Sequence, residues 1–214
     1  IFPINQRGQS SYELGSGQYG IDRWRASGSG LAESLQSDGV VFGVSGQTAG
    51  RWFRNTTPAT LPPGKYTFSA LVTEVNVPAA GDYVSIGIGR GASVFVERIQ
   101  VTEPGFYTST IDAVDANSVL ISFPGGKDAS IKIAAMKLEL GDTQTLAHQE
   151  NGVWVLNELP DYGAELLNCQ RYFQMFRTEA LRPSYALDCR PVMAGEPTPD
   201  TLTLADVTYY TLSV

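Results

Sequence analysis

The sequence has few of the residues that most catalytic and metal-binding sites require. His148 is its only histidine, and Cys169 and Cys189 are its only cysteines. A Ser-His-Asp or Cys-His catalytic arrangement would have to use His148, which lies in a polar segment where we expect a solvated loop histidine. One histidine and two scattered cysteines also lack the ligand spacing of a transition-metal site. We therefore predict no catalytic residues, no metal site and no enzymatic activity.

Positive charge and long apolar runs are also scarce. Fifteen Lys and Arg stand against 22 Asp and Glu, for a net charge of −7, which excludes a general binder of the nucleic-acid backbone. No window approaches the roughly 18 apolar residues of a membrane span, and no basic-then-apolar leader opens the chain. We expect a soluble protein without membrane insertion or an export address. Because the chain starts at Ile1 rather than Met, we also expect a fragment or a processed form.

Two cysteines are too few for a disulfide framework in a chain of 214 residues. We expect two reduced and mostly buried thiols. A bridge between Cys169 and Cys189 stays open as the alternative.

Glycine, proline and alternating apolar residues are abundant instead. The chain has 22 Gly and 12 Pro, and only 17% of its residues are charged, which suits a strand-rich globular protein. Alternation with a period of two predicts strands over residues 40–44, 65–73, 83–88, 93–101, 118–123 and 130–140. Turn residues separate these runs, so we predict an all-β fold, an antiparallel β-sandwich of the jelly-roll type. Within the last run the apolar parity switches across Ala134 and Ala135, which indicates a bulge or a change of sheet.

The last third of the chain loses this alternation. We predict a jelly-roll domain over residues 1–141, a connector over 142–160 with one apolar patch at 153–156, and a short helix plus a small β unit over 161–214. Asp161 is the expected N-cap of a helix over 162–170, and strands are expected at 171–176, 201–204 and 207–212. This unit is too small to be stable alone. Its last strand would leave an unpaired apolar edge, so we expect an oligomer or a truncated unit.

Sugar binding requires an exposed aromatic face with hydrogen-bonding side chains beside it. Tyr83 shares a strand face with Ser85, while Val84, Ile86 and Ile88 point inward. Trp52 lies beside Arg51 and Arg54. We predict carbohydrate-binding roles for Tyr83, Trp52, Arg51 and Ser85, with burial of the aromatic rings as the alternative. Trp24 and Trp154 are expected to anchor the core or an interface.

Other candidate motifs favour structural roles. Residues 87–91 (GIGRG) follow a strand and precede another, so a glycine-rich hairpin is favoured over a phosphate-binding loop. The acid pairs Asp112/Asp115 and Glu97/Glu103 are interpreted as solvated turn residues rather than as the two carboxylates of a glycosidase.

Residues 62–70 (PPGKYTFSA) and 137–141 (KLELG) resemble segments of jelly-roll carbohydrate-binding modules of the galactose-binding-like type. The resemblance covers about residues 20–141. Such modules often hold a structural calcium through loop oxygens, and Asp112, Asp115 or Asp128 could serve here. No other cofactor is expected.

A second resemblance rests on segments near both ends of the chain: residues 4–8 (INQRG), 22–25 (DRWR), 138–141 (LELG), 160–162 (PDY) and 169–173 (CQRYF). Together they resemble an arrangement in bacteriophage and prophage tail-fibre and other virion surface proteins. The resemblance implies a structural or receptor-binding component of a tail fibre, baseplate or spike. Such a component is assembled in the host cytoplasm, carried in the virion and usually homotrimeric, with other virion proteins and a bacterial surface polysaccharide as partners.

Two alternatives stay open. The chain could be a carbohydrate-binding module of a secreted glycan-degrading enzyme, which the segment at 62–70 supports equally well. It could also be a glycosidase or lyase itself, a hypothesis that the single histidine and the absence of internal repeats weaken.

Overall fold

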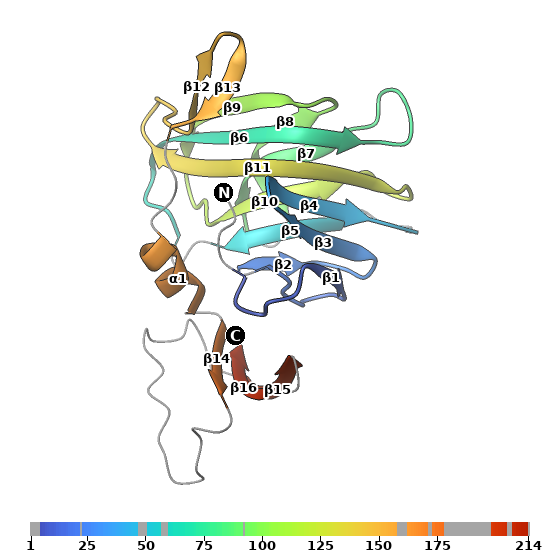
Figure 1. The fold of residues 1–214 in the computed structure, drawn as a ribbon. Coiled ribbons are helices and arrows are strands. Elements are labelled where there is room, and N and C mark those ends of the chain that lie inside the picture. Colours follow the sequence, from blue (N-terminus) through green and yellow to red (C-terminus); the bar gives the residue numbers. More distant parts are fainter. Residues whose placement is uncertain are drawn as a thin grey trace.

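Two antiparallel sheets face each other in the main body of the molecule (Figure 1). The computed structural model describes residues 5–21, 23–46, 51–56, 60–91, 93–157, 162–170, 173–177, 198–204 and 207–213. The six-stranded sheet has the spatial order β1 (Ser11–Leu14), β3 (Leu31–Gln36), β4 (Gly39–Val44), β11 (Ala129–Leu140), β6 (Gly64–Asn76), β9 (Gly105–Ala113). The five-stranded sheet has the order β2 (Trp24–Ala26), β5 (Arg51–Thr56), β10 (Ser118–Phe123), β7 (Val84–Arg90), β8 (Val94–Val101).

The chain changes sheet at most connections after β4. It passes from β4 to β5, from β5 to β6 and from β6 to β7, and again between β8 and β9, β9 and β10, and β10 and β11. Each pairing in the two sheets is antiparallel. This repeated crossing between two sheets is the topology of a jelly-roll sandwich. The predicted all-β antiparallel sandwich is confirmed.

Alternating apolar residues from both sheets fill the space between them. An aromatic series crosses this core from Trp24 to Phe42, with ring centroids 4.9 Å apart, then to Phe53 at 5.0 Å and to Phe123 at 6.2 Å. All of these rings are at most 4% exposed. Trp24 is therefore a core residue, as predicted.

Strand β11 carries a bulge. The pairing of β11 with β6 shifts register between Lys132 and Ile133 and again between Ile133 and Ala135. Ile131 and Ile133 belong to the core between the sheets, whereas Ala135 belongs to a second apolar cluster. The switch of parity in the sequence is thus a bulge, and the strand stays in the same sheet.

A β-hairpin lies within the predicted connector, where only an apolar patch was expected. Strands β12 (Ala147–Glu150) and β13 (Val153–Leu156) pair around Asn151 and Gly152, both with positive φ. Trp154 stacks on Phe106 of β9, and Leu146 and Ala147 pack with Ala135 of β11. The hairpin therefore covers part of the six-stranded sheet, and Trp154 is an interface anchor, as predicted.

Helix α1 (Tyr162–Gln170) has the predicted bounds. After it, β14 (Phe173–Arg177), β16 (Val207–Ser213) and β15 (Thr198–Leu204) form a three-stranded sheet in that spatial order. Strand β16 lies between its two neighbours, so the prediction that the last strand has an unpaired edge is wrong. Cys169 is buried on α1, while Cys189 and Asp161 lie outside the described residues. The division of the chain into three units stays a prediction.

No helix among the described residues is long and apolar enough to cross a membrane.

Candidate functional site

The outer face of the five-stranded sheet carries a row of polar and aromatic side chains. Phe53, Ile121 and Ile86 are paired across β5, β10 and β7 and point into the core. Because side chains alternate along a strand, the next residues point to the opposite face. Their register places four residues side by side across this face: Trp52, Ser122, Ser85 and Gln100.

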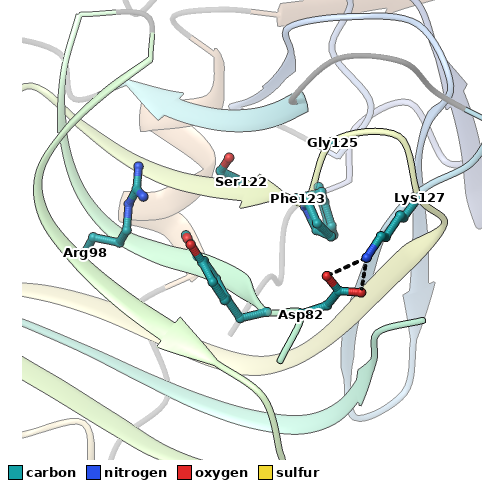
Figure 2. Close-up of a pocket in the computed structure, with 9 residues that line it drawn as sticks. Asp82, Arg98, Ser122, Phe123, Gly125 and Lys127 are labelled. Carbon is teal, nitrogen blue, oxygen red and sulfur yellow. Dashed lines mark hydrogen bonds and ion pairs between the residues drawn. The ribbon is translucent and has the colours of Figure 1, made fainter. Parts of the chain in front are cut away.

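A hollow of about 350 Å³ opens beside the middle of this row, where Ser122 and Ser85 line it. Three separate segments of the chain line it, namely the start of β7, the middle of β8 and the end of β10 with the turn that follows (Figure 2). The lining residues are Asp82, Tyr83, Ser85, Arg98, Ser122, Phe123, Pro124, Gly125 and Lys127. Hydroxyl groups, an aromatic ring and charged groups therefore converge in one place.

An ion pair closes one side of the hollow. Nζ of Lys127 lies 2.8 Å from Oδ1 and 2.7 Å from Oδ2 of Asp82. The Asp82 side chain is 17% exposed and that of Lys127 is 44% exposed. The pair joins the turn before β7 to the turn after β10, so it fixes the position of this wall. An exposed ion pair contributes about 0–1 kcal/mol to stability, so its main effect is on geometry.

Arg98 stands on the opposite side of the hollow from Lys127 (Figure 2). Its side chain is exposed, and its guanidinium lies 4.9 Å from the ring centroid of Phe95 on the same strand. A cation over an aromatic face is attracted by the ring quadrupole, so Phe95 limits the orientations of Arg98. The residue opposite Arg98 on β7 is Gly87, which has no side chain to obstruct the guanidinium.

The inner wall of the hollow is continuous with the core. Phe123 lines the hollow, is 4% exposed and packs edge-on against Phe53. Tyr83 is half-buried, which leaves part of its ring accessible. Because the side chains of this wall are already held in place by packing, little conformational entropy would be lost from them when a ligand binds.

The structure brings together two of the residues that the sequence singled out for carbohydrate binding. Tyr83 and Ser85 line the hollow, and Val84, Ile86 and Ile88 point into the core as expected. Trp52 lies on the same sheet face, beside Ser122, but does not line the hollow. The backbone of Arg51 pairs with Phe123, and its side chain lies outside the described part of the structure. The roles of these residues in binding stay predictions.

Arg98, Ser122 and the Asp82–Lys127 pair are site residues that sequence reasoning missed. Alternation along residues 98–101 does place Arg98 and Gln100 on the face opposite Ile99 and Val101. It gives no indication of which strand lies beside them.

His148 lies on β12, away from the hollow. Its Nε2 is 2.8 Å from Oε1 of Glu150, and its Nδ1 is hydrogen-bonded to Oδ1 of Asn157. The Glu150 carboxylate, and after it the Asn157 amide, raise the pKa of the exposed His148 ring above its usual value. The expectation of a solvated histidine is confirmed, on a strand rather than in a loop.

The acids considered for calcium binding lie on different segments of the chain. Asp112 is exposed near the end of β9 and Asp115 is exposed in the turn after it, whereas Asp128 follows β10 and accepts a hydrogen bond from the backbone of Gly46 at 2.6 Å. Within the described residues, no three His, Cys, Asp or Glu side chains gather into a metal site. The calcium suggestion stays a prediction.

Residues 87–91 form the end of β7 and the turn into β8, so the glycine-rich hairpin is confirmed.

No protein-family model and no curated protein sequence matches the chain. Solved structures similar to it include a mutant of CBM29-2, a family 29 carbohydrate-binding module, with 12% identity over 61% of this chain and 91% of that chain and a TM-score of 0.37. The family 29 module CBM29_1 from Piromyces equi is 10% identical over 61% of this chain and 90% of its own, with a TM-score of 0.33. A third similar structure is the family 11 module from Clostridium thermocellum in complex with a β-1,3-1,4-mixed-linked tetrasaccharide. It is 15% identical over 60% of this chain and 94% of its own, also with a TM-score of 0.33. Matches this distant carry no functional argument.

Proposed function

We propose that this protein binds a glycan on the outer face of its five-stranded sheet and does not itself catalyse a reaction. The observation that supports the proposal is the hollow in which Tyr83 meets Ser85, Ser122 and Arg98. A pyranose has an apolar C–H face that can lie on an aromatic ring and a rim of hydroxyls that require hydrogen-bonding partners. The hollow contains both kinds of group within a volume of about 350 Å³.

The row across the sheet provides room for more than one sugar. Ser122 lies between Ser85 and Trp52 in the register of the sheet. Neighbouring strands are about 4.8 Å apart, so Trp52 lies about 10 Å from the strand that carries Ser85. A half-buried tryptophan at that distance suits a second stacking position for a longer oligosaccharide.

For the biological setting, we favour a virion component that contacts a bacterial surface polysaccharide. The support is in the sequence segments at 4–8, 22–25, 138–141, 160–162 and 169–173, of which residues 4, 22, 160, 161, 171 and 172 lie outside the described part of the structure. A carbohydrate-binding module of a secreted glycan-degrading enzyme is the alternative, because the same glycan site would serve it equally well.

Binding to a glycan array, followed by isothermal titration with the best ligand, tests the site. We expect Tyr83→Ala to weaken binding about tenfold or more, because the stacking surface is lost. Tyr19→Ala is the matched control, since Tyr19 is also half-buried but does not line the hollow. Equal effects of the two variants would place the binding site elsewhere, and the absence of any glycan ligand would end the proposal.

Native mass spectrometry tests the setting separately. A homotrimer at micromolar concentration is expected of a fibre component. A monomer at that concentration would favour the enzyme-associated module.

A further inference from the structure

The hollow carries an excess of positive charge in a protein that is acidic as a whole. Its lining includes two cationic side chains, Arg98 and Lys127, and one carboxylate, Asp82. Both oxygens of Asp82 contact Nζ of Lys127, so these two charges offset each other. The positive charge of Arg98 is not offset by any other residue that lines the hollow, whereas the whole chain has a net charge of −7.

The guanidinium of Arg98 has no charged or hydrogen-bonding partner in the part of the chain that the structure describes. Its only recorded interaction there is the cation–π contact with the Phe95 ring, at 4.9 Å. Contact with a ring face leaves the N–H groups at the edge of the guanidinium unbonded to the protein. These groups lie in a fixed plane and match the two oxygens of a carboxylate.

We infer that the ligand of the hollow is an acidic saccharide, one whose carboxylate pairs with Arg98 while its ring contacts Tyr83. This inference rests on the proposed glycan binding and specifies its chemical class. Ser85 on β7 and Ser122 on β10 also line the hollow, and their hydroxyls are the hydrogen-bonding partners for hydroxyls of the same sugar. The long-range field of the acidic chain disfavours such a ligand, so recognition depends on close contact with Arg98.

Lys127 is a less suitable partner for the acidic group. Its ammonium already contacts both Asp82 oxygens, and a ligand carboxylate placed there would also meet the Asp82 charge. A bidentate arginine contact is in addition stronger and more directional than a contact with a point charge. The two sides of the hollow therefore differ: an anionic group belongs at Arg98, and neutral hydroxyls belong at the Asp82–Lys127 wall.

A panel of acidic bacterial polysaccharide fragments, each paired with its carboxyl-reduced neutral form, provides the test. Affinities of the whole chain for both members of each pair are measured by isothermal titration at low and at high salt. Arg98→Gln removes the charge, and Arg98→Lys keeps the charge without the planar fork. Arg90→Gln is the matched control, because Arg90 is an exposed arginine at the end of β7 that does not line the hollow.

We expect at least one acidic fragment to bind about tenfold or more tightly than its neutral form. Arg98→Gln should remove this preference by weakening the binding of the acidic form more than that of the neutral form, with Arg98→Lys intermediate. Added salt should weaken only the acidic member of the pair.

Two different failures can be told apart. Equal binding of both forms, or equal losses from Arg98→Gln and Arg90→Gln, would overturn the acidic class and leave glycan binding in place. No binding of either form across the panel, or binding that is insensitive to Tyr83→Ala, would overturn the proposed function together with this inference.

Discussion

Phe106 and Trp154 stack with their ring centroids 4.1 Å apart and their planes at 24°. The contact joins β9 of the six-stranded sheet to the β12–β13 hairpin. Around it, Ala135, Leu146 and Ala147 form a small apolar cluster that is separate from the core between the sheets. This cluster holds the hairpin on the sandwich.

Trp154→Ala should therefore detach the hairpin. Because Trp154 is only half-buried, we expect a loss of about 2 kcal/mol in the free energy of unfolding, below the cost for a fully buried ring. Urea denaturation measures this loss, and hydrogen exchange should show faster exchange over residues 147–156. Val153→Ala is the control, since Val153 is 64% exposed and should change neither measurement. Unchanged exchange in the Trp154 variant would contradict this view of the hairpin.

Gly87→Ala should destabilise the five-stranded sheet. Gly87 has φ +153°, and a Cβ atom there would lie 2.2 Å from the carbonyl oxygen of Glu97, which is backbone and cannot move aside cheaply. We expect a loss of about 3 kcal/mol, from backbone strain and displacement of β8. Gly43→Ala is the matched strand control, because its nearest neighbours would be at 3.8 Å. A chemical denaturation curve that puts both variants at the same stability would contradict the prediction.

The charge of His148 makes stability depend on pH. The Glu150 carboxylate first, and the Asn157 amide second, raise the pKa of His148 in the folded state above its unfolded value of about 6.5. A raised pKa means that the folded state binds the proton more tightly than the unfolded state. The stabilisation is therefore complete below the unfolded pKa and is lost as the pH rises through the folded pKa.

Because the chain has a single histidine, its imidazole resonances can be assigned without ambiguity in an NMR titration. Glu150→Gln should lower the midpoint of that titration toward about 6.5. Glu103→Gln, an exposed acid on a different turn, should leave the midpoint unchanged. A midpoint that is the same in the wild type and in Glu150→Gln would show that the contact does not form in solution.

Trp52→Ala should affect long ligands more than short ones. Trp52 lies on the same sheet face as the hollow, but its strand is two strands away from the one that carries Ser85. A monosaccharide in the hollow should therefore not reach it. We expect unchanged affinity for a monosaccharide and a loss of several-fold for a tetrasaccharide of the same sugar. Isothermal titration with the two ligands measures the difference. A loss for the monosaccharide as well would mean that Trp52 belongs to the hollow.

The alternation of apolar residues predicted much of the sandwich. The strands expected at 40–44, 65–73, 83–88, 93–101, 118–123 and 130–140 are all present with small shifts at their ends. Strands β1, β2, β3, β5 and β9 of the sandwich were not predicted. In β9, Ser109 interrupts the apolar positions Tyr107 and Ile111 on the inner side of the strand. The β12–β13 hairpin was missed although Asn151 and Gly152 are a strong hairpin signal, because the exposed residues of β12 are polar.

The candidate site could be predicted only in part. Tyr83 lies immediately before β7 and Ser85 lies on it, so their shared face follows from the period of two. Arg98, Ser122 and Lys127 reach the hollow only because β10 and β8 lie on either side of β7. That order depends on the crossings between the two sheets, which a single sequence does not encode locally.

Because the hollow is assembled from residues 82–85, 98 and 122–127, it exists only after β7 has paired with both neighbours. A ligand that binds there binds the folded chain and not the unfolded one, so it must raise the temperature of unfolding, by an amount that grows with the logarithm of its concentration relative to its dissociation constant. A thermal-shift screen of saccharides can thus identify the ligand of this protein without any assay of its biological activity.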